Sequence, residues 1–305
     1  KLFLTIWFLL ASWQLNAQSN GIVRCLASDD MNFYVGTGGA GVWIDNGTAW
    51  APINNGLSNL NIYSLATQDS HVYAGTNGGG IFVSTNSGKN WTAVNSGLSE
   101  KYVWALVVDG SNVFAGTDGG GIFLSTNNGV NWTEINSGLT NKRIQSVFVH
   151  DGHIFAGTST SGVFVSTDNG ANWMQANNGL TSSFISCFVS DGDNLYVGTT
   201  SGGVFVTSDN GAKWKPVNKG LDNQSVRALV ILDSFIFAGT NGGGVFMSSN
   251  SGATWTEVNN GLTEKDVISM TTDGTNILVG TNGGGVFLST DNGTHWAEAN
   301  KGLTK

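Results

Sequence analysis

Seven tryptophans recur at equal spacing, and they constrain the fold more than any other feature of the sequence. Each lies 41 residues after the one before it: Trp50, Trp91, Trp132, Trp173, Trp214, Trp255 and Trp296. A constant period of this length is typical of proteins built from copies of one supersecondary unit. Seven periods account for 287 residues, the number left from 305 after an 18-residue leader. We therefore expect a single repeat domain.

Each copy contains four short runs of strand-forming residues. In the second copy they are 62–67, 71–76, 80–85 and 91–95, separated by Gly, Asn, Asp and Ser. Runs rich in Val, Ile, Phe, Tyr and Thr predict strands, and no segment has a helical period. Runs such as 121–124 are apolar on both faces, so both faces must be covered. The sequence thus predicts an all-β protein, a seven-bladed β-propeller of four-stranded antiparallel blades.

The copies also set the expected domain organisation. The predicted blades are 19–57, 58–98, 99–139, 140–180, 181–221, 222–262 and 263–305. The first copy is shorter in its third turn, around Ile44 to Gly47. Because all four strands of each copy are contiguous in sequence, we expect blade 7 to pack on blade 1 with no strand swap at closure.

The N-terminal segment predicts export. Lys1 precedes an apolar run over 2–13, and Ala17 ends a site of small residues. This pattern is typical of a secretory signal peptide over 1–18, which makes the mature protein secreted or periplasmic. The run is short for a membrane anchor, and no other run could span a bilayer. We expect no membrane association after signal cleavage.

The third turn of each copy carries a recognisable motif. It reads Ser-Thr-Asp-Asn-Gly-Ala-Asn-Trp over 166–173 and Ser-Thr-Asp-Asn-Gly-Thr-His-Trp over 289–296. This resembles the Asp-box, or BNR repeat, of sialidases, sortilin-type receptors and photosystem II assembly propellers, with Asn replacing Asp at Asn86, Asn127 and Asn250. In the box, Asp or Asn accepts backbone hydrogen bonds, Gly adopts a positive φ, and Trp covers the blade edge. The resemblance implies the fold; enzymes and non-enzymes share the box, so it implies no single function.

Several patterns resemble chemical sites but favour structural roles. Gly36 to Gly41 matches GxGxxG, yet a strand rather than a helix follows it, so we predict a turn without a dinucleotide. His150 with His153, and Asp191 with Asp193, supply too few ligands for a metal. We expect neither a metal nor a cofactor.

Two composition features complete the list of exclusions. A net charge of −8 argues against nucleic-acid binding. Cys25 and Cys187 lie in blades 1 and 5, too far apart for a disulfide, so we predict two free, buried thiols.

Differences between the copies concentrate at the start of the first strand. One position holds Arg24, Tyr63, Trp104, Gln145, Ser186, Arg227 and Ile268. The position two residues earlier holds Ile22, Asn61, Tyr102, Arg143, Phe184, Ser225 and Asp266. Residues two apart on a strand share a face, which becomes apolar again at Leu26 and its equivalents. These positions are therefore expected at the mouth of the central channel.

The mouth holds the candidate site. All three arginines of the chain lie at these positions, and Arg suits bidentate contact with carboxylate or phosphate. The aromatic residues could stack on a sugar or a peptide. The predicted ligand-binding residues are Arg24, Tyr63, Tyr102, Trp104, Arg143, Gln145, Arg227 and Asp266. The alternative is that loops at a mouth simply vary, with Arg24 and Arg227 paired to neighbouring acids.

The hypothesis is an exported, monomeric, non-catalytic propeller that binds a glycan, peptide or protein. A sialidase-like or other glycoside hydrolase is one alternative, with roles for the three arginines, Tyr63 or Tyr102, Glu264 and Asp266. Against it, sialidases have six blades, long insertions and an Arg-Ile-Pro motif, and the connections here are too short to exclude water. An assembly factor of the photosystem-propeller type is a second alternative.

Overall fold

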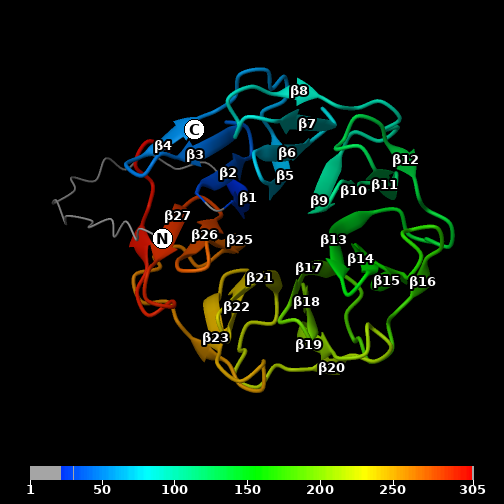
Figure 1. The fold of residues 1–305 in the computed structure, drawn as a ribbon. Helices are drawn as coiled ribbons and strands as arrows, with labels where there is room; N and C mark the ends of the chain where they lie inside the picture. The colour runs from blue at the N-terminus through cyan, green and yellow to red at the C-terminus, as the bar shows by residue number, and fades with distance from the viewer. Residues whose placement is uncertain (1–21, 30, 304–305) are drawn as a thin grey trace, which may run out of the picture.

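The computed structural model describes residues 22–29 and 31–303, which form a closed ring of seven sheets (Figure 1). The innermost strands are β1 (Val23–Ser28), β5 (Ile62–Gln68), β9 (Val103–Asp109), β13 (Ile144–His150), β17 (Ile185–Ser190), β21 (Val226–Leu232) and β25 (Val267–Thr272). The second strands are β2 (Phe33–Thr37), β6 (His71–Thr76), β10 (Asn112–Thr117), β14 (His153–Thr158), β18 (Leu195–Thr199), β22 (Phe235–Thr240) and β26 (Ile277–Thr281).

The outer half of each sheet is shorter. The third strands are β3 (Val42–Asp45), β7 (Ile81–Ser84), β11 (Ile122–Ser125), β15 (Val163–Ser166), β19 (Gly203–Thr207), β23 (Gly244–Ser248) and β27 (Gly285–Ser289). The fourth strands are β4 (Trp50–Pro52), β8 (Thr92–Ala93), β12 (Thr133–Glu134), β16 (Met174–Gln175), β20 (Lys215–Pro216), β24 (Thr256–Glu257) and β28 (Ala297–Glu298).

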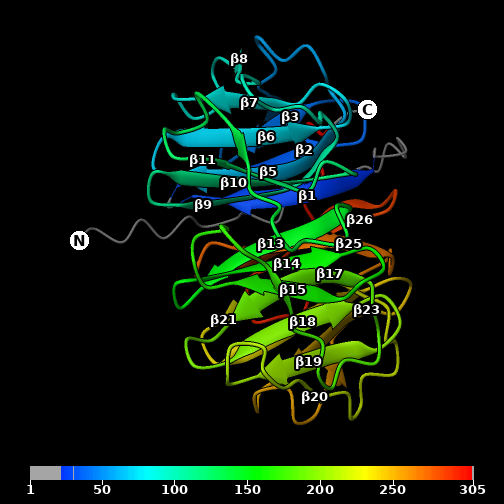
Figure 2. The ribbon, with the colours of Figure 1, turned by 90° about the vertical axis from the view of Figure 1, so that its right-hand side faces the viewer.

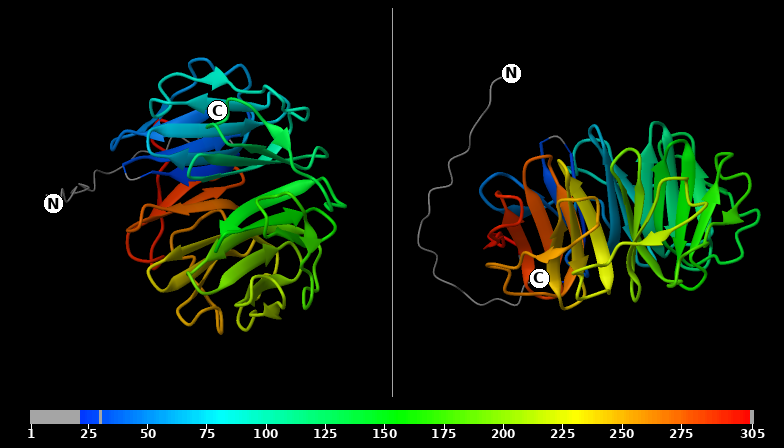
Figure 3. Two further views of the ribbon diagram at one scale, coloured as in Figure 1. Left: turned by 45° about the vertical axis from the view of Figure 1, so that its right-hand side comes forward. Right: turned by 90° about the horizontal axis from the view of Figure 1, so that it is seen from below.

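Every sheet is antiparallel and follows chain order, from β1-β2-β3-β4 to β25-β26-β27-β28. We number these sheets as blades 1 to 7. The innermost strands contact one another around the ring, including β25 with β1. The inner strands of the blades run roughly along the ring axis (Figures 2 and 3). The predicted seven-bladed architecture is confirmed, as is closure without a swapped strand. The signal peptide predicted over 1–18 lies outside the described residues.

The core lies between the blades, as the two-sided apolar strands require. One cluster joins blade 1 to blade 2 through Tyr34, Ile62 and Phe82, each at most 2% exposed. The closing seam is equivalent, because Val23 and Val35 of blade 1 pack with Leu278 and Val286 of blade 7. Each sheet therefore hides its two apolar faces only when both neighbours are present.

The repeated tryptophan connects neighbouring blades. Trp91 Nε1 of blade 2 donates to the Ile53 carbonyl of blade 1 at 2.5 Å, and its backbone N–H donates to the Asn55 carbonyl at 2.9 Å. Trp50 closes the ring in the same way, donating to the carbonyls of Ala299 and Lys301 in blade 7. The sequence-based interpretation, in which the Trp covers the edge of its own blade, was therefore incomplete.

The same contacts explain why the outer strands are short. A strand was expected over 91–95, but β8 contains only Thr92 and Ala93. Trp91 turns its backbone toward blade 1, while the Asn95 side chain accepts from Ile81 N–H at 2.8 Å. Backbone groups that bond across a seam or to a side chain no longer extend the β-ladder.

The Asp-box turn has the predicted hydrogen bonds. Asp168 Oδ1 accepts from the Ser166 hydroxyl and from Asn172 N–H, both at 2.8 Å. Gly170 has a φ of 86°, as expected, but Asn169 before it is also left-handed, with a φ of 55°. Asn is among the few residues that tolerate this region, which accounts for its place in the motif.

Both cysteines are free, as predicted. Cys25 lies in β1 and Cys187 in β17, and each is partly buried. Burial raises the pKa of both thiols to about 12, so they remain protonated at neutral pH.

Candidate binding site at the channel mouth

One of the two variable positions identified from the sequence is a β-bulge in all seven blades. Register between the first two strands shifts at this residue, as between Val23 and Cys25 or between Ile62 and Ser64. The bulged residues are Arg24, Tyr63, Trp104, Gln145, Ser186, Arg227 and Ile268. A bulge re-aims a side chain and ends regular pairing, and bulges are enriched beside functional sites.

The bulge overturns one sequence-based expectation. Simple alternation places Arg24 on the same face as Leu26. In the structure Leu26 packs toward blade 7, whereas the Arg24 guanidinium lies over the Tyr63 ring of blade 2. The extra residue interrupts the two-residue period, so the variable side chain leaves the face that the pattern assigns to it.

A third variable position, which the sequence analysis missed, completes the mouth. It is the first residue of the turn after the second strand: Gly38, Asn77, Asp118, Ser159, Thr200, Asn241 and Asn282. Asn77, for example, donates its N–H to the Asn61 carbonyl of its own blade and forms a β-bridge with Tyr102 of the next. This position also differs between copies, and the same comparison of repeats could have found it.

In blades 2, 3, 4, 6 and 7 a side chain holds the segment that leads into the first strand. Glu100 Oε1 accepts from the N–H groups of Lys101 and Tyr102. Asn141 and Glu264 accept in the same way from the N–H groups of Arg143 and Asp266, each at 2.9 Å. These bonds fix the backbone of the mouth independently of the variable side chains.

Arg143 is engaged in an ion pair. Its Nε lies 2.7 Å from Asp118 Oδ1, and its Cζ lies 5.8 Å from the centre of the Trp104 ring. Asp118 raises the pKa of Arg143 through this hydrogen bond. The Arg143 side chain is 60% exposed, so solvent weakens the pair, which mainly orients the guanidinium.

Arg227 is connected to an acid through an amide. With its side-chain amide in the orientation that satisfies both neighbours, Asn241 accepts from Arg227 and donates to Asp266 Oδ1, each at 2.8 Å. Asn282 donates to Asp266 Oδ2 at 2.8 Å. Arg227 is therefore linked to Asp266 only through the Asn241 amide. These hydrogen bonds connect blade 6 to blade 7 at this end of the ring.

Arg24 differs from both. Its Cζ lies 4.6 Å from the centre of the Tyr63 ring, and its Nε is buried without a hydrogen-bond partner among the described residues. The adjacent turn residue is Gly38, and a Cβ there would lie 2.9 Å from Arg24 Nε. The sequence left open that Arg24 pairs with a neighbouring acid. Within residues 22–29 and 31–303, Arg24 forms no ion pair.

The structure therefore groups the predicted residues by sector. Arg24 and Tyr63 meet on blades 1 and 2, Trp104 and Arg143 on blades 3 and 4, and Arg227 and Asp266 on blades 6 and 7. Tyr102 is 47% exposed on the rim, and Gln145 is half-buried on blade 4. The eight residues lie at the same end of the ring, but they do not converge on one point.

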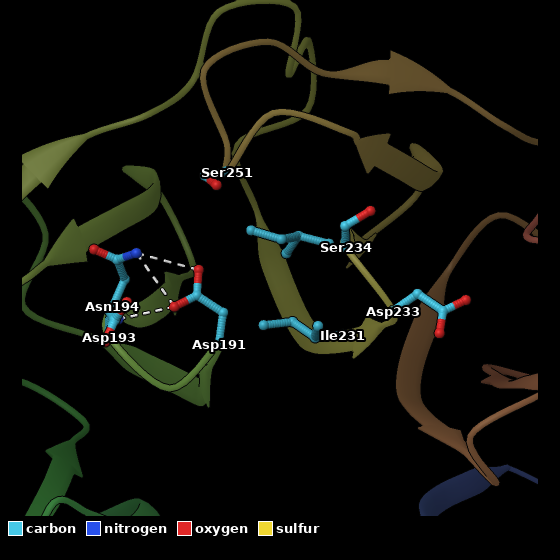
Figure 4. A pocket seen from close by; sticks show the side chains of 8 residues that line it. Asp191, Asp193, Asn194, Ile231, Asp233, Ser234 and Ser251 are labelled. Atoms are coloured by element: carbon cyan, nitrogen blue, oxygen red, sulfur yellow. Dashed lines mark hydrogen bonds between the residues drawn. The ribbon is translucent and has the colours of Figure 1, made fainter.

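The opposite end of the ring carries a small hollow between blades 5 and 6 (Figure 4). It is lined by residues of the first turns, including Asp191, Asp193, Asn194 and Asp233. Asp191 accepts hydrogen bonds from Asn194 and from the Tyr196 hydroxyl. No group of three or more metal-ligating side chains occurs among the described residues.

The remaining chemical motifs lie in turns. Gly36 belongs to β2 and Gly41 directly precedes β3, so the GxGxxG segment joins two strands. His153 Nδ1 lies 2.7 Å from the Asp151 carbonyl within the first turn of blade 4. No helix of the described residues is long and apolar enough to cross a membrane.

Comparison with known proteins places the fold. A protein-family model described as the DUF6242 beta propeller domain matches residues 5–146, 124–219 and 185–305. No functionally curated protein matches the sequence significantly.

Several solved structures share this fold at low sequence identity. The extracellular domain of BT4673 from B. thetaiotaomicron is 20% identical with a TM-score of 0.76, over 90% of this chain and 39% of that one. A GH74 xyloglucanase from Xanthomonas campestris is 14% identical with a TM-score of 0.78, over 93% of this chain and 55% of that one. YCF48 bound to D1 peptide is 14% identical with a TM-score of 0.71, over 88% of this chain and 93% of that one.

Proposed function

The chain belongs to the DUF6242 beta-propeller family, and from this premise we propose that it is an exported, non-catalytic propeller that binds a glycan, peptide or protein at its channel mouth. One observation carries the proposal. Three positions that vary between otherwise similar blades lie together at one end of the ring, and the three arginines of the chain are among them. A purely structural ring does not require different residues at these positions in each blade, whereas recognition of an asymmetric ligand does require them.

Two structural neighbours support this kind of role. YCF48, which matches over nearly its whole length, was solved with a bound peptide, so a ring of this size can hold one. BT4673 contributes an extracellular domain to the comparison, consistent with export directed by residues 1–18. We extend both properties to this chain as part of the proposal.

The acidic residues at the mouth favour binding over hydrolysis. A glycosidase needs two carboxyl groups at a defined separation beside the substrate. Here Glu264 accepts from the backbone N–H of Asp266, and Asp266 is held by Asn241 and Asn282. Carboxylates occupied in this way serve the architecture of the rim.

The test is retention of ligands on peptide and glycan arrays. Wild-type protein is compared with a mouth variant in which Arg24, Tyr102, Arg143 and Arg227 are all changed to Ala. The matched control changes Asp193 and Ser234 to Ala, two exposed residues beside the hollow at the opposite end. We expect the control to keep the wild-type binding profile and the mouth variant to lose it. Equal retention by all three proteins, or no retained ligand for wild type, would refute the proposal.

A further inference from the structure

The three arginines of the mouth have different partners, and this difference identifies a subsite. We propose that Arg24, held by Tyr63 above the bare backbone of Gly38, forms a carboxylate-binding subsite that takes an acidic residue of a peptide. The inference rests on the proposed function and specifies the ligand class that the mouth would bind.

The repeat itself provides the comparison. In blade 3 the turn residue is Asp118, which pairs at 2.7 Å with Arg143, a residue of the next blade at the position two before the bulge. In blade 6 it is Asn241, which accepts from Arg227. In blade 1 the equivalent residue is Gly38, which has no side chain to offer. Two arginines thus carry an internal partner, and the third is adjacent to the one turn of the seven in which this partner is missing.

The environment of Arg24 prepares it for a carboxylate. Its Cζ lies 4.6 Å from the centre of the Tyr63 ring, which holds the guanidinium in place. Its Nε is buried and has no partner among the described residues. No hydrogen bond within the described residues therefore competes with a ligand oxygen for this guanidinium. Arg also presents a planar fork that matches the two oxygens of a carboxylate.

The surroundings favour a peptide over a sugar acid. Two exposed apolar residues adjoin the blade 1 turn: Ile22, whose carbonyl accepts from Gly38 N–H, is 37% exposed, and Leu60, whose carbonyl accepts from Gly41 N–H, is 38% exposed. Aliphatic side chains such as Ile22 and Leu60 suit the apolar residues of a peptide. Sugar rings are usually bound on free aromatic faces, but in this sector Arg24 lies over the Tyr63 ring, and the exposed aromatic ring of Tyr102 lies one blade further on. An acidic residue flanked by apolar residues fits both the charge and the apolar rim.

The probes are two acetylated, amidated tripeptides, Leu-Glu-Leu and Leu-Gln-Leu, with glucuronate as a sugar acid. Titration calorimetry or NMR measures each Kd. We expect wild type to bind the Glu peptide roughly 10-fold more tightly than the Gln peptide, since a charged hydrogen bond is about twice as strong as a neutral one. Glucuronate should bind more weakly than the Glu peptide because it lacks the apolar contacts.

Two variants remove the subsite by different routes. Arg24→Gln deletes the guanidinium, and Gly38→Asp copies into blade 1 the acid that Asp118 provides in blade 3. Both should abolish the preference for Glu over Gln. Gly38→Asp retains the guanidinium, so it tests the charge even if Arg24→Gln disturbs the rim, although its Cβ, 2.9 Å from Arg24 Nε, shifts the Arg24 side chain. Lys213→Gln is the matched control: it removes one positive charge from the exposed Asp-box turn of blade 5, at the opposite end of the ring, and should keep the preference within about twofold. Thermal melts establish that each variant is folded.

The outcomes separate this inference from the proposed function. If wild type does not distinguish Glu from Gln, or if both Arg24→Gln and Gly38→Asp keep the preference, the subsite is wrong. Glucuronate binding as tight as that of the Glu peptide would overturn the peptide assignment. In each of these cases array ligands that the mouth variant loses would still support a binding mouth.

Discussion

At the scale of single residues, the Asp-box uses its acidic residue as a hydrogen-bond acceptor. Asp168, Asp209 and Asp291 accept from the N–H four residues later at 2.8–2.9 Å. Asn86, Asn127 and Asn250 do so at 2.9–3.0 Å in blades 2, 3 and 6. Because an uncharged amide performs the same task, the negative charge is dispensable at neutral pH.

This equivalence predicts a specific pH dependence of stability. Hydrogen bonds from the Asn172 side chain and backbone lower the pKa of Asp168. Hydrogen bonds from the Thr207 hydroxyl and, to a smaller extent, from Lys213 N–H lower the pKa of Asp209. A depressed folded-state pKa contributes stability above the unfolded value of about 3.9, and this contribution is lost as the pH falls through the folded value.

We therefore compare wild type with the variant that carries Asp168→Asn and Asp209→Asn. Urea midpoints at pH 7 should be similar for the two proteins. Between pH 5 and pH 2.5 the wild-type midpoint should fall further, because the variant has two fewer such carboxylates to protonate. Equal losses in both proteins would show that these two carboxylates do not contribute to the acid sensitivity.

At the scale of elements, the outer strand owes its position to the next blade. The two-residue fourth strands make few ladder hydrogen bonds, and the adjacent Trp bonds to two carbonyls of the preceding blade. Trp173, for example, is 3% exposed and donates through Nε1 to the Ile135 carbonyl at 2.7 Å. Seam and outer strand are therefore stabilised by the same residue.

Trp173→Ala should destabilise the protein by about 3–5 kcal/mol, the usual cost of deleting a buried large aromatic side chain. For a chain of this size we expect the melting temperature to fall by roughly 10 °C. Met174→Ala is the matched control, since Met174 is the next residue and is 61% exposed. Calorimetry that finds equal melting temperatures for both variants would contradict the role assigned to Trp173.

At the scale of the whole molecule, the seam between blades 7 and 1 is built like the other six. It uses the same Trp contacts and the same kind of apolar cluster, and no strand crosses it. In the other blades three residues connect the buried Leu to the mouth position, as 99–101 connect Leu98 to Tyr102. Within residues 22–29 and 31–303, the seam at which the chain begins and ends thus has the same kinds of contact as the other six.

A circular permutant tests this equivalence. Leu303 is joined to Ile22 by Ser-Glu-Lys, copied from 99–101, and new ends are placed between Thr140 and Asn141. We expect a folded monomer whose melting temperature lies within about 5 °C of the unpermuted ring, because exposed connections tolerate new termini. A permutant that does not fold, or that folds only as an oligomer, would show that the natural seam is special.

Much of the fold could be predicted because each blade repeats the same local information. The Trp period, the strand-forming runs and the Gly-rich turns recur in every copy, so errors in one copy are corrected by the others. The candidate site was predictable only in part. Variation between copies located the mouth at Arg24 and Tyr102, yet missed the turn position of Gly38 and assigned Arg24 to the wrong face.

What the sequence by itself determined is the number of blades, their strand order and the end of the ring at which the copies diverge. These follow from periodicity, which is a property of neighbours along the chain. Only the tertiary structure decided which blade each Trp bonds and which arginine has no hydrogen-bonded side-chain partner among the described residues. Those outcomes depend on contacts between blades and on a one-residue bulge at Arg24. A bulge shifts register without changing the repeat length, so it leaves no trace in the period.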